Sequence, residues 1–301
     1  MKRKLKSLVR DSLRFFLGKN LYTWLRFVLT HKYIPSFKEP RSMNEKIVHR
    51  KLYDDPHKFS KYASKYTVRE YVEETIGEEY LVSLYKVKKT ITFQDFKDLP
   101  QKFVVKTSNG GGGNNVLIVK NKAELDINSI CHQFNGFLQR KAGVSSDELF
   151  YGLETPYVLF EEFLEPADGK LLEFKWHVFN TGGAEPELIL QIDSDKMNRS
   201  ERYSRSLFDE SGKRLDFQWG KYPPVKDFKV PKHFELMKRI VSKLAEPFEY
   251  VRVDLHLSDE KIFFSELTFC NDSGFGVFTD KKYDFLLGKL WNEYESIGEN
   301  S

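Results

Sequence analysis

A glycine run between two apolar segments constrains the fold more than any other stretch of the chain. Residues 103–105 are Phe-Val-Val and residues 116–119 are Val-Leu-Ile-Val, so both favour β-strands. Between them lie Lys106 and a polar loop that contains Gly110, Gly111, Gly112 and Gly113. Because glycine loses much backbone entropy on folding, a fold keeps such a run where the backbone turns sharply or approaches another group closely. The stretch predicts a hairpin with a glycine loop at its tip.

The glycine loop allows two interpretations. Successive backbone N–H groups can bind phosphate oxygens, and Lys106 supplies a matching positive charge. Walker and dinucleotide-binding loops both lead into a helix, whereas here the lysine precedes the glycines and a strand follows them. The loop could therefore be a flap over a polyphosphate, or an ordinary long hairpin with a flexible tip. The glycines alone favour the ordinary hairpin, but the lysine and the features further along the chain favour the flap.

Composition excludes several classes of protein. The chain has 301 residues, of which 40% are hydrophobic and 31% charged, as expected for a globular protein of two or three lobes. Its net charge of +4 is too small to indicate nucleic acid, and no basic patch with interleaved aromatics occurs beyond the N-terminus. The two cysteines form no metal-binding spacing. No apolar run approaches the ~20 residues that are needed to span a bilayer, and we expect no signal peptide. We expect a cytoplasmic protein without a nucleic-acid partner.

The N-terminal segment is strongly basic. A 3.6-residue period predicts an amphipathic helix over residues 2–17, ended by Gly18, and a second apolar segment follows over residues 21–29. Residues 1–32 contain nine lysines and arginines and one acid, a net charge of +8. Two interpretations stay open: a helical pair packed on the body with a solvated basic face, or peripheral docking of residues 2–32 on an anionic membrane or a polyanionic substrate.

The rest of the chain alternates between helical and β-rich segments. The predicted helices cover residues 44–52, 61–74, 123–141 and 231–245, and the predicted strands lie within 80–99, 157–160, 173–179 and 188–193. Residues 194–224 are polar and irregular, with arginines at 199, 202 and 205. A loop of that length predicts a segment that faces substrate or acts as a lid.

A second informative stretch is the hairpin formed by residues 251–257 and 262–269, with a turn at 258–261. A period of two places Arg252, Asp254 and His256 on one face of its first strand. On the second strand, the same period places Phe264, Glu266 and Thr268 together. Asp254 and Glu266 can face each other only if the loop has an odd number of residues.

Two opposed carboxylates repel each other, so a positive charge should lie near them. Arg252 is one candidate, and a divalent cation is the other, since Mg²⁺ is usually held by one or two carboxylates plus substrate phosphates. The hairpin alone slightly favours a simple arginine–acid pair on a solvated face.

The order of these features resembles the ATP-grasp superfamily. More closely, the segments 44–46, 64–71, the glycine loop and residues 266–269 look like the teichuronopeptide-biosynthesis type of ATP-grasp protein, found with bacterial surface-polysaccharide synthesis. The resemblance covers residues 35–285. It implies an α+β fold in which two lobes with antiparallel sheets grip ATP. The expected units are a basic helical extension (1–34), a helical, substrate-side lobe (35–100), a small lobe with the flap (101–165) and a large lobe with the metal-binding hairpin (166–301).

The resemblance also implies roles for individual residues. Lys65 would contact the α-phosphate side, and Lys106 phosphate and the adenine edge. Ser108 and the four glycines would form the flap. The adenine hinge would consist of Glu161, Glu162, Phe163 and Leu164. Asp168 would meet the ribose, and Lys175 the γ-phosphate.

For the metal, the resemblance implies that Asp254, Glu266 and Thr268 hold Mg²⁺, while Arg252 steadies the developing charge. Most ATP-grasp enzymes have asparagine where this chain has Thr268, and relatives of the polysaccharide type have a Pro-Gly step where it has Asn271-Asp272. Because of these two departures, the sequence does not decide between one Mg²⁺ site and two.

The implied activity is an ATP-dependent carboxylate–amine ligase that works through an acyl phosphate. Its partners would be a small-molecule or glycan carboxylate, such as a uronic acid, and an amine. A kinase on the same scaffold is an alternative, with His256 or Asp193 as the general base. A non-catalytic module in polysaccharide assembly is another alternative, but the intact set of Arg252, Asp254 and Glu266 argues against it.

Overall fold

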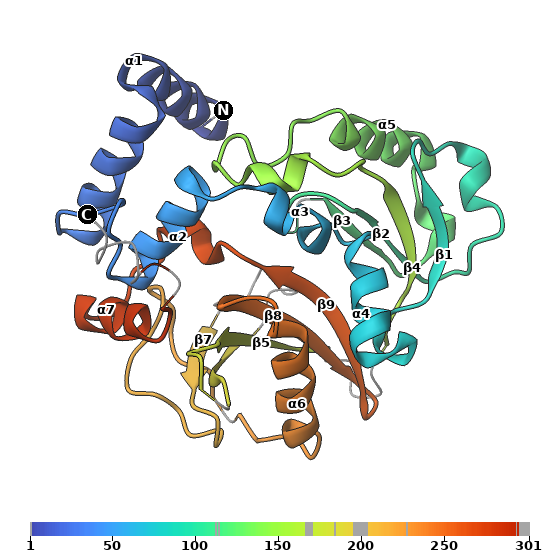
Figure 1. Cartoon of the computed structure of the whole chain (residues 1–301). Helices are drawn as coiled ribbons and strands as arrows, with labels where there is room; N and C mark the ends of the chain where they lie inside the picture. Colours follow the sequence, from blue (N-terminus) through green and yellow to red (C-terminus); the bar gives the residue numbers. More distant parts are fainter. Residues whose placement is uncertain are drawn as a thin grey trace.

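Two antiparallel sheets, each with its own hydrophobic core, frame the protein (Figure 1). The computed structural model describes residues 2–111, 113, 115–165, 171–183, 185–194, 204–226, 228–292 and 294, and for residues 2–9, 172 and 194 it describes the backbone. Gly112 and Asp168, both predicted to meet the nucleotide, lie outside the described residues. The division of the chain into four units stays a prediction.

The smaller sheet contains the glycine hairpin. Its strand order is β1 (Leu84–Lys88), β4 (Val158–Glu162), β2 (Phe103–Thr107) and β3 (Val116–Val119). β2 and β3 pair directly on either side of the glycine loop, as the sequence predicted. Buried aromatic side chains of β2 and β4 pack against α5 (Ile127–Leu138), which anchors the hairpin to this lobe.

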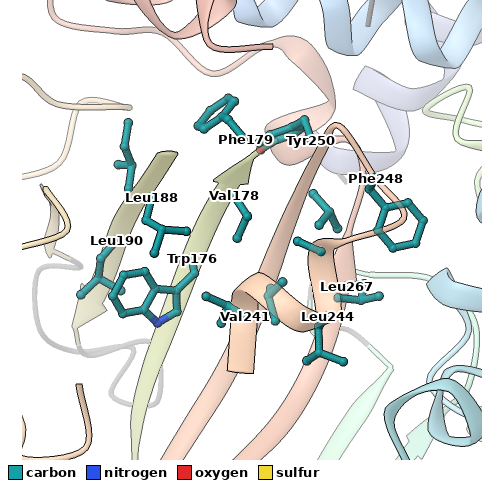
Figure 2. Packing of buried hydrophobic residues seen from close by; sticks show 14 of the residues in the cluster. Trp176, Val178, Phe179, Leu188, Leu190, Val241, Leu244, Phe248, Tyr250 and Leu267 are labelled. Atoms are coloured by element: carbon teal, nitrogen blue, oxygen red, sulfur yellow. The ribbon is translucent and has the colours of Figure 1, made fainter. Parts of the chain in front are cut away.

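The larger sheet has β5 (Leu172–Phe179) at its centre. The strand order is β7 (Ser204–Phe208), β6 (Glu187–Ser194), β5, β8 (Tyr250–Ser258) and β9 (Lys261–Thr268). Because side chains alternate along a strand, the sheet has one apolar and one polar face. On the apolar face, Trp176 and Val178 pack against α6 (Phe234–Ala245) (Figure 2). Burial of each large side chain of this kind contributes about 1.5–3 kcal/mol.

The predicted helix over residues 61–74 is two helices, α3 (His57–Ala63) and α4 (Val68–Ile76). The single-helix prediction is wrong because Ser64 begins a turn: its hydroxyl accepts hydrogen bonds from the backbone N–H groups of Tyr66 and Thr67, both at 3.4 Å. Serine favours such local bonds over a continuing helix. The turn places Lys65 against the glycine hairpin.

The segment 194–224 is also more regular than predicted, since β7 occupies residues 204–208 and pairs with β6. Arg205 is buried in this strand rather than exposed on a lid. Two other polar residues of the segment, Arg199 and Arg202, lie outside the described residues.

The turn between β8 and β9 has two residues, Asp259 and Glu260, both with positive φ. With this even loop, Asp254 would face Ser265. A register shift between Asp254 and Leu255 leaves Ser265 as an extra residue, a β-bulge, and restores Glu266 opposite Asp254. The expectation of an odd loop was therefore wrong. The bulge also separates Phe264, which is buried in the core opposite Leu255, from Glu266 on the polar face.

The remaining helices, α1 (Lys2–His31), α2 (Met43–Tyr53) and α7 (Lys281–Lys289), lie near one another, beside the large sheet (Figure 1). α2 packs on α7, while α1 extends away from both sheets. Gly18 interrupts α1 with φ +74°, where the sequence predicted a stop. Among the described residues, no helix combines the length and the hydropathy that a membrane span requires.

Candidate functional site

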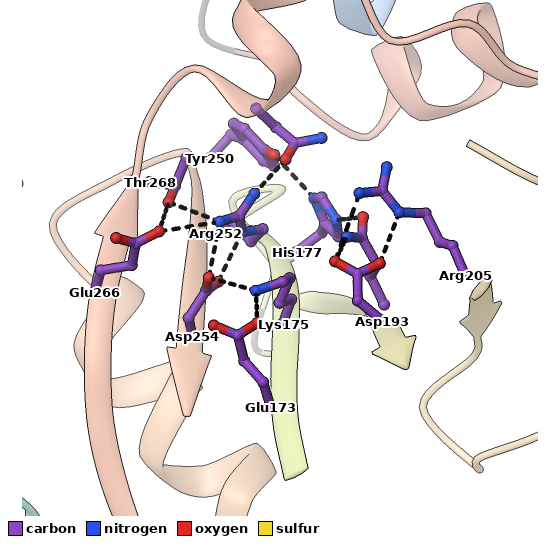
Figure 3. Close-up of polar contacts among 12 residues, drawn as sticks. Glu173, Lys175, His177, Asp193, Arg205, Tyr250, Arg252, Asp254, Glu266 and Thr268 are labelled. Atoms are coloured by element: carbon purple, nitrogen blue, oxygen red, sulfur yellow. Dashed lines mark hydrogen bonds and ion pairs between the residues drawn. The ribbon is translucent and has the colours of Figure 1, made fainter. Parts of the chain in front are cut away.

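The polar face of β5, β8 and β9 gathers four of the charged residues predicted for the site, Lys175, Arg252, Asp254 and Glu266 (Figure 3). Alternation on β5 turns Lys175 to this face, and the register pairs it with Asp254 on β8. Asp254 in turn lies opposite Glu266 on β9, and Arg252 opposite Thr268. Strand β5 and the β8–β9 hairpin, which are far apart in sequence, thus bring five of the predicted residues together.

Arg252 is the centre of this cluster. Its Nε and Nη2 atoms donate to the two carboxylate oxygens of Asp254, each at 2.7 Å. Nη2 also donates to Thr268 Oγ1 at 3.0 Å and to Glu266 Oε1 at 3.3 Å. A guanidinium held by a bidentate carboxylate has little rotational freedom, so Arg252 is oriented by the strands themselves.

Lys175 is buried beside this pair. Its ammonium group lies 3.2 Å from Asp254 Oδ2 and also pairs with Glu173. Burial alone would lower the pKa of Lys175, but the charges of Asp254 and Glu173 outweigh it and raise that pKa. Lys175 is therefore a cation at neutral pH despite its burial.

Glu266 is the more accessible of the two opposed acids, with 31% of its side chain exposed while Asp254 is fully buried. Burial acts to raise the pKa of Glu266, but the charges of Lys65, Arg252 and Lys175 prevail and lower it to about 2. The carboxylate is ionised over the whole physiological range.

Lys65 connects this cluster to the glycine loop. Its Nζ donates to the carbonyl oxygen of Gly110 at 2.9 Å and lies 3.4 Å from Glu266 Oε2. Its backbone N–H donates to the carbonyl of Ser108 at 2.8 Å. Gly110 has φ +76° and Gly113 φ +72°, a backbone conformation that favours glycine.

Lys106 lies on the smaller sheet and pairs with Glu161 at 2.6 Å, next to Arg69. The pKa of His256 responds to lysines of both sheets. Burial chiefly lowers the pKa of His256, and the positive charges of Lys175 and Lys106 lower it further.

The other described residues predicted for the nucleotide site lie on the smaller lobe and differ in burial and in hydrogen bonding. Ser108 is buried, and its hydroxyl accepts from the backbone N–H of Tyr157 at 2.9 Å, so it ties the flap to the start of β4. Glu162 is exposed and accepts from Ser83 at 2.9 Å. Gly111 is exposed, and Phe163 and Leu164 follow β4 in a half-buried segment outside the strands.

A second polar network, not predicted from the sequence, extends from the cluster across β5, β6 and β7 (Figure 3). His177 contacts Gln191 at 3.3 Å, Gln191 donates to Asp193 at 3.0 Å, and Arg205 donates to Asp193 at 2.7 Å. Burial, reinforced by the charge of Arg252, lowers the pKa of His177 to about 3. The sequence signal was the alternation of these polar residues on strands otherwise apolar.

Asp193 does not suit the general-base role considered for a kinase. Its side chain is fully buried, and its oxygens accept hydrogen bonds from Arg205 and Gln191. A carboxylate held in this way is an anchor for Arg205 and not a proton acceptor for a substrate.

The residues present fit Mg²⁺ bound together with a polyphosphate. Among the described residues, no group of three or more His, Cys, Asp or Glu side chains is arranged to hold a metal alone. Asp254, Glu266 and Thr268 nevertheless offer hard oxygen ligands on one face, and Mg²⁺ is usually held by one or two carboxylates plus phosphates. Glu266 is the more available ligand, since both oxygens of Asp254 already accept hydrogen bonds from Arg252.

Comparison with known proteins gives the family. No curated protein matches the chain. Among solved structures, it is similar to D-alanine–D-alanine ligase from Helicobacter pylori, with 16% identity, a TM-score of 0.39, and coverage of 79% of this chain and 60% of that one. It is also similar to D-alanine–D-alanine ligase from Bacillus anthracis, with 15% identity, a TM-score of 0.44, and coverage of 78% of this chain and 69% of that one. A third similar structure is phosphoribosylamine–glycine ligase from Thermotoga maritima (15%, 0.44, 79% and 55%).

The chain thus spans less than two thirds of the length of two of these three proteins. The family model described as TupA-like ATPgrasp matches residues 45–292, which is well over half of the chain. The protein therefore belongs to the TupA-like ATP-grasp family, and the predicted family and its α+β fold are confirmed.

Proposed function

We propose that the protein is an ATP-dependent carboxylate–amine ligase that acts through an acyl phosphate, and that it attaches an amino acid or amine to a sugar carboxylate of a bacterial surface polysaccharide. The observation that carries this proposal is the set of cations Lys65, Lys175 and Arg252 around Asp254 and Glu266, of which Lys65 also contacts the glycine loop. The family supports the polysaccharide substrate, whose identity stays a proposal.

The chemistry needs such a set of cations. A carboxylate that attacks the γ-phosphorus of ATP approaches a group of the same charge, so the reaction requires positive charge held in place before the attack. Lys175 and Arg252 are buried and oriented by ion pairs, and they would face the γ-phosphate and the attacking carboxylate. Lys65, Lys106 and the flap would hold the phosphates, and Glu161 to Leu164 the adenine.

The balance of charge in the cluster supports a nucleotide that arrives with its own cation. Three cations, Lys65, Lys175 and Arg252, are matched by three carboxylates, Glu173, Asp254 and Glu266. A bare triphosphate would therefore enter a neutral site. Mg²⁺, held by Glu266 and Asp254, would supply charge neutralisation and Lewis acidity.

In the proposed reaction, a carboxylate oxygen forms a bond to the γ-phosphorus and ADP leaves. An amine then attacks the acyl carbon, phosphate leaves with the original carboxylate oxygen, and the amine loses a proton. One ATP and one amide bond thus account for one ADP and one phosphate.

Oxygen labelling tests this sequence. The purified protein is incubated with ATP, Mg²⁺, an amino acid and an ¹⁸O-labelled uronic acid or uronate-containing glycan, and the released phosphate is analysed by mass spectrometry. We expect phosphate that carries one ¹⁸O, formed in step with ADP and amide. Unlabelled phosphate, or a stable phosphorylated sugar with no free phosphate, would contradict the ligase.

One observation favours the kinase as a second candidate. The Nδ1 atom of His256 is buried without a hydrogen-bond partner among the described residues, and burial lowers the pKa of the ring. Burial keeps the ring neutral, so it could accept a proton from a hydroxyl. A kinase would leave the phosphoryl group on the sugar, and His256→Ala would abolish that product, whereas ligase activity should survive the change.

A further inference from the structure

In the first half of α1, the charged side chain of Arg14 turns toward the protein. Arg14 donates to the carbonyl of Ser145 at 2.9 Å and to Asp147 at 2.7 Å, and Lys19 lies 3.8 Å from the same carboxylate. A surface helix normally turns its apolar stripe toward the core and its charged side to solvent. This helix has the opposite orientation.

The apolar side of the same helix is exposed. Phe15 is 82% and Phe16 81% exposed, and their rings meet edge to face with centroids 5.5 Å apart. By the helical period, the sequence positions 5, 8, 9 and 12 fall on the same side, and three of the four are Leu or Val. Single exposed apolar residues are ordinary, but adjacent exposed aromatic rings on an apolar stripe mark an interaction site.

Charge identifies the partner. The whole chain has a net charge of +4 and residues 1–32 have +8, so residues 33–301 have −4. An anionic surface therefore attracts α1 and repels the rest of the molecule. Each Lys or Arg near an anionic bilayer contributes about 1 kcal/mol, and apolar side chains that enter the headgroup region add to this.

We propose that residues 2–17 of α1 lie in the interface of an anionic lipid bilayer, with Phe15 and Phe16 inserted below the headgroups. None of the described helices meets the requirements for a membrane span, so the helix would lie on the bilayer and not cross it. In Figure 1 this half of α1 extends beyond both sheets, where a flat surface can reach it.

The second half of α1 would transmit this docking to the site. Phe27 is fully buried, His31 Nε2 contacts the carbonyl of Gly274 at 3.1 Å, and Arg26 lies over the ring of Phe275 at 3.6 Å. Asn271 in the same turn accepts a hydrogen bond from Arg252. The docked protein would thus hold its charged face at a fixed orientation to the bilayer, which suits a membrane-bound acceptor.

Vesicle binding tests the proposal without any need for catalysis, so its failure would leave the ligase untouched. The full chain is sedimented with vesicles of phosphatidylcholine and with vesicles of phosphatidylcholine and phosphatidylglycerol. We expect binding to the anionic vesicles only, weakened by salt, and reduced at least about tenfold in the variant F15S/F16S. Phe93→Ser, at another exposed aromatic residue on the smaller lobe, is the matched control and should bind as the wild type does.

Three outcomes would overturn the proposal. One is the absence of binding to anionic vesicles, and another is equal binding by wild type and F15S/F16S. The third is a dimer, detected by light scattering, that does not bind vesicles and that F15S/F16S converts to monomers, because the exposed rings would then pack against a second copy.

Discussion

The carboxylates of Asp254 and Glu266 lie opposite each other on adjacent strands, and a single extra residue, Ser265, makes this possible. The bulge turns Phe264 into the core and Glu266 to the polar face, although the two residues are only two positions apart. The two acids differ in exposure, so their removal should have different effects.

Asp254→Asn should destabilise the fold, whereas Glu266→Gln should mainly weaken binding of Mg²⁺ and ATP. The first change leaves Arg252 and Lys175 buried without their shared anion, which costs about 3–5 kcal/mol. The second removes a partly exposed charge and leaves Arg252 and Lys175 paired with Asp254, so its cost in stability should be smaller. Urea unfolding and calorimetric titration with ATP at varied Mg²⁺ measure the two effects. Equal loss of stability in both variants would contradict the distinction.

Lys106→Ala should weaken ATP binding by at least about tenfold, since a half-buried cation at the base of the flap is lost. The matched control is Lys102→Ala, at a nearby lysine whose ion pair with Glu165 is exposed. Calorimetry with ATP and Mg²⁺ compares the two. Unchanged affinity in Lys106→Ala would remove this residue from the nucleotide site.

Stability should fall with pH below about 6.5 because of His177. The pKa of His177 is lowered to about 3 in the fold, mainly by burial, so between pH 6.5 and 3 the unfolded chain binds the extra proton. This contribution amounts to about 1.4 kcal/mol per pH unit, or roughly 2 kcal/mol between pH 6.5 and 5. Glu266, whose lowered pKa is about 2, loses its contribution only as pH falls below its unfolded value of 4.5.

Urea unfolding at pH 7.5, 6.0 and 5.0 measures this decline, to which His31 and His256 also contribute because burial lowers the pKa of each. His177→Gln should flatten the decline, while His132→Gln, at an exposed position on α5, should leave it unchanged. A decline of the same slope in His177→Gln would show that another group is responsible.

Gly274→Ala should destabilise the protein by about 1–3 kcal/mol. Gly274 has φ +75°, and an added Cβ would lie 2.8 Å from Val48 Cγ2 and 3.0 Å from the carbonyl of Asn44. Gly136→Ala on α5 is the control: an added Cβ there has no neighbour within 4 Å among the described atoms, so helix propensity should give about 0.5–1 kcal/mol of added stability. Thermal unfolding of both variants measures the difference.

The sequence predicted the strands with alternating side chains better than the irregular features within and between them. Alternation identified β5 and β8 and the faces that carry Lys175 and Asp254, because period-two patterns survive in strands with one buried face. It missed the bulge at Ser265. The registers that pair Asp254 with Ser265 and with Glu266 differ by only one unpaired residue, which no sequence pattern marks. It also missed β7, because polar residues such as Arg205 are buried there through ion pairs and not by apolar character.

The candidate site was recovered through family resemblance more than through pattern. Lys65 carries no local signal that separates it from a surface lysine, and only the fold brings it to Gly110 and Glu266. The network of His177, Gln191 and Asp193 depends on pairing between strands, which no single segment of sequence encodes.

The turn between α3 and α4 has a mechanical consequence. Lys65 grips the loop at two points, through its own amide to Ser108 and through its ammonium group to Gly110. Movement of the glycine loop away from this turn must either break both hydrogen bonds or carry the start of α4 along with the loop. The lysine that is proposed to bind the nucleotide therefore also fixes the position of the glycine loop.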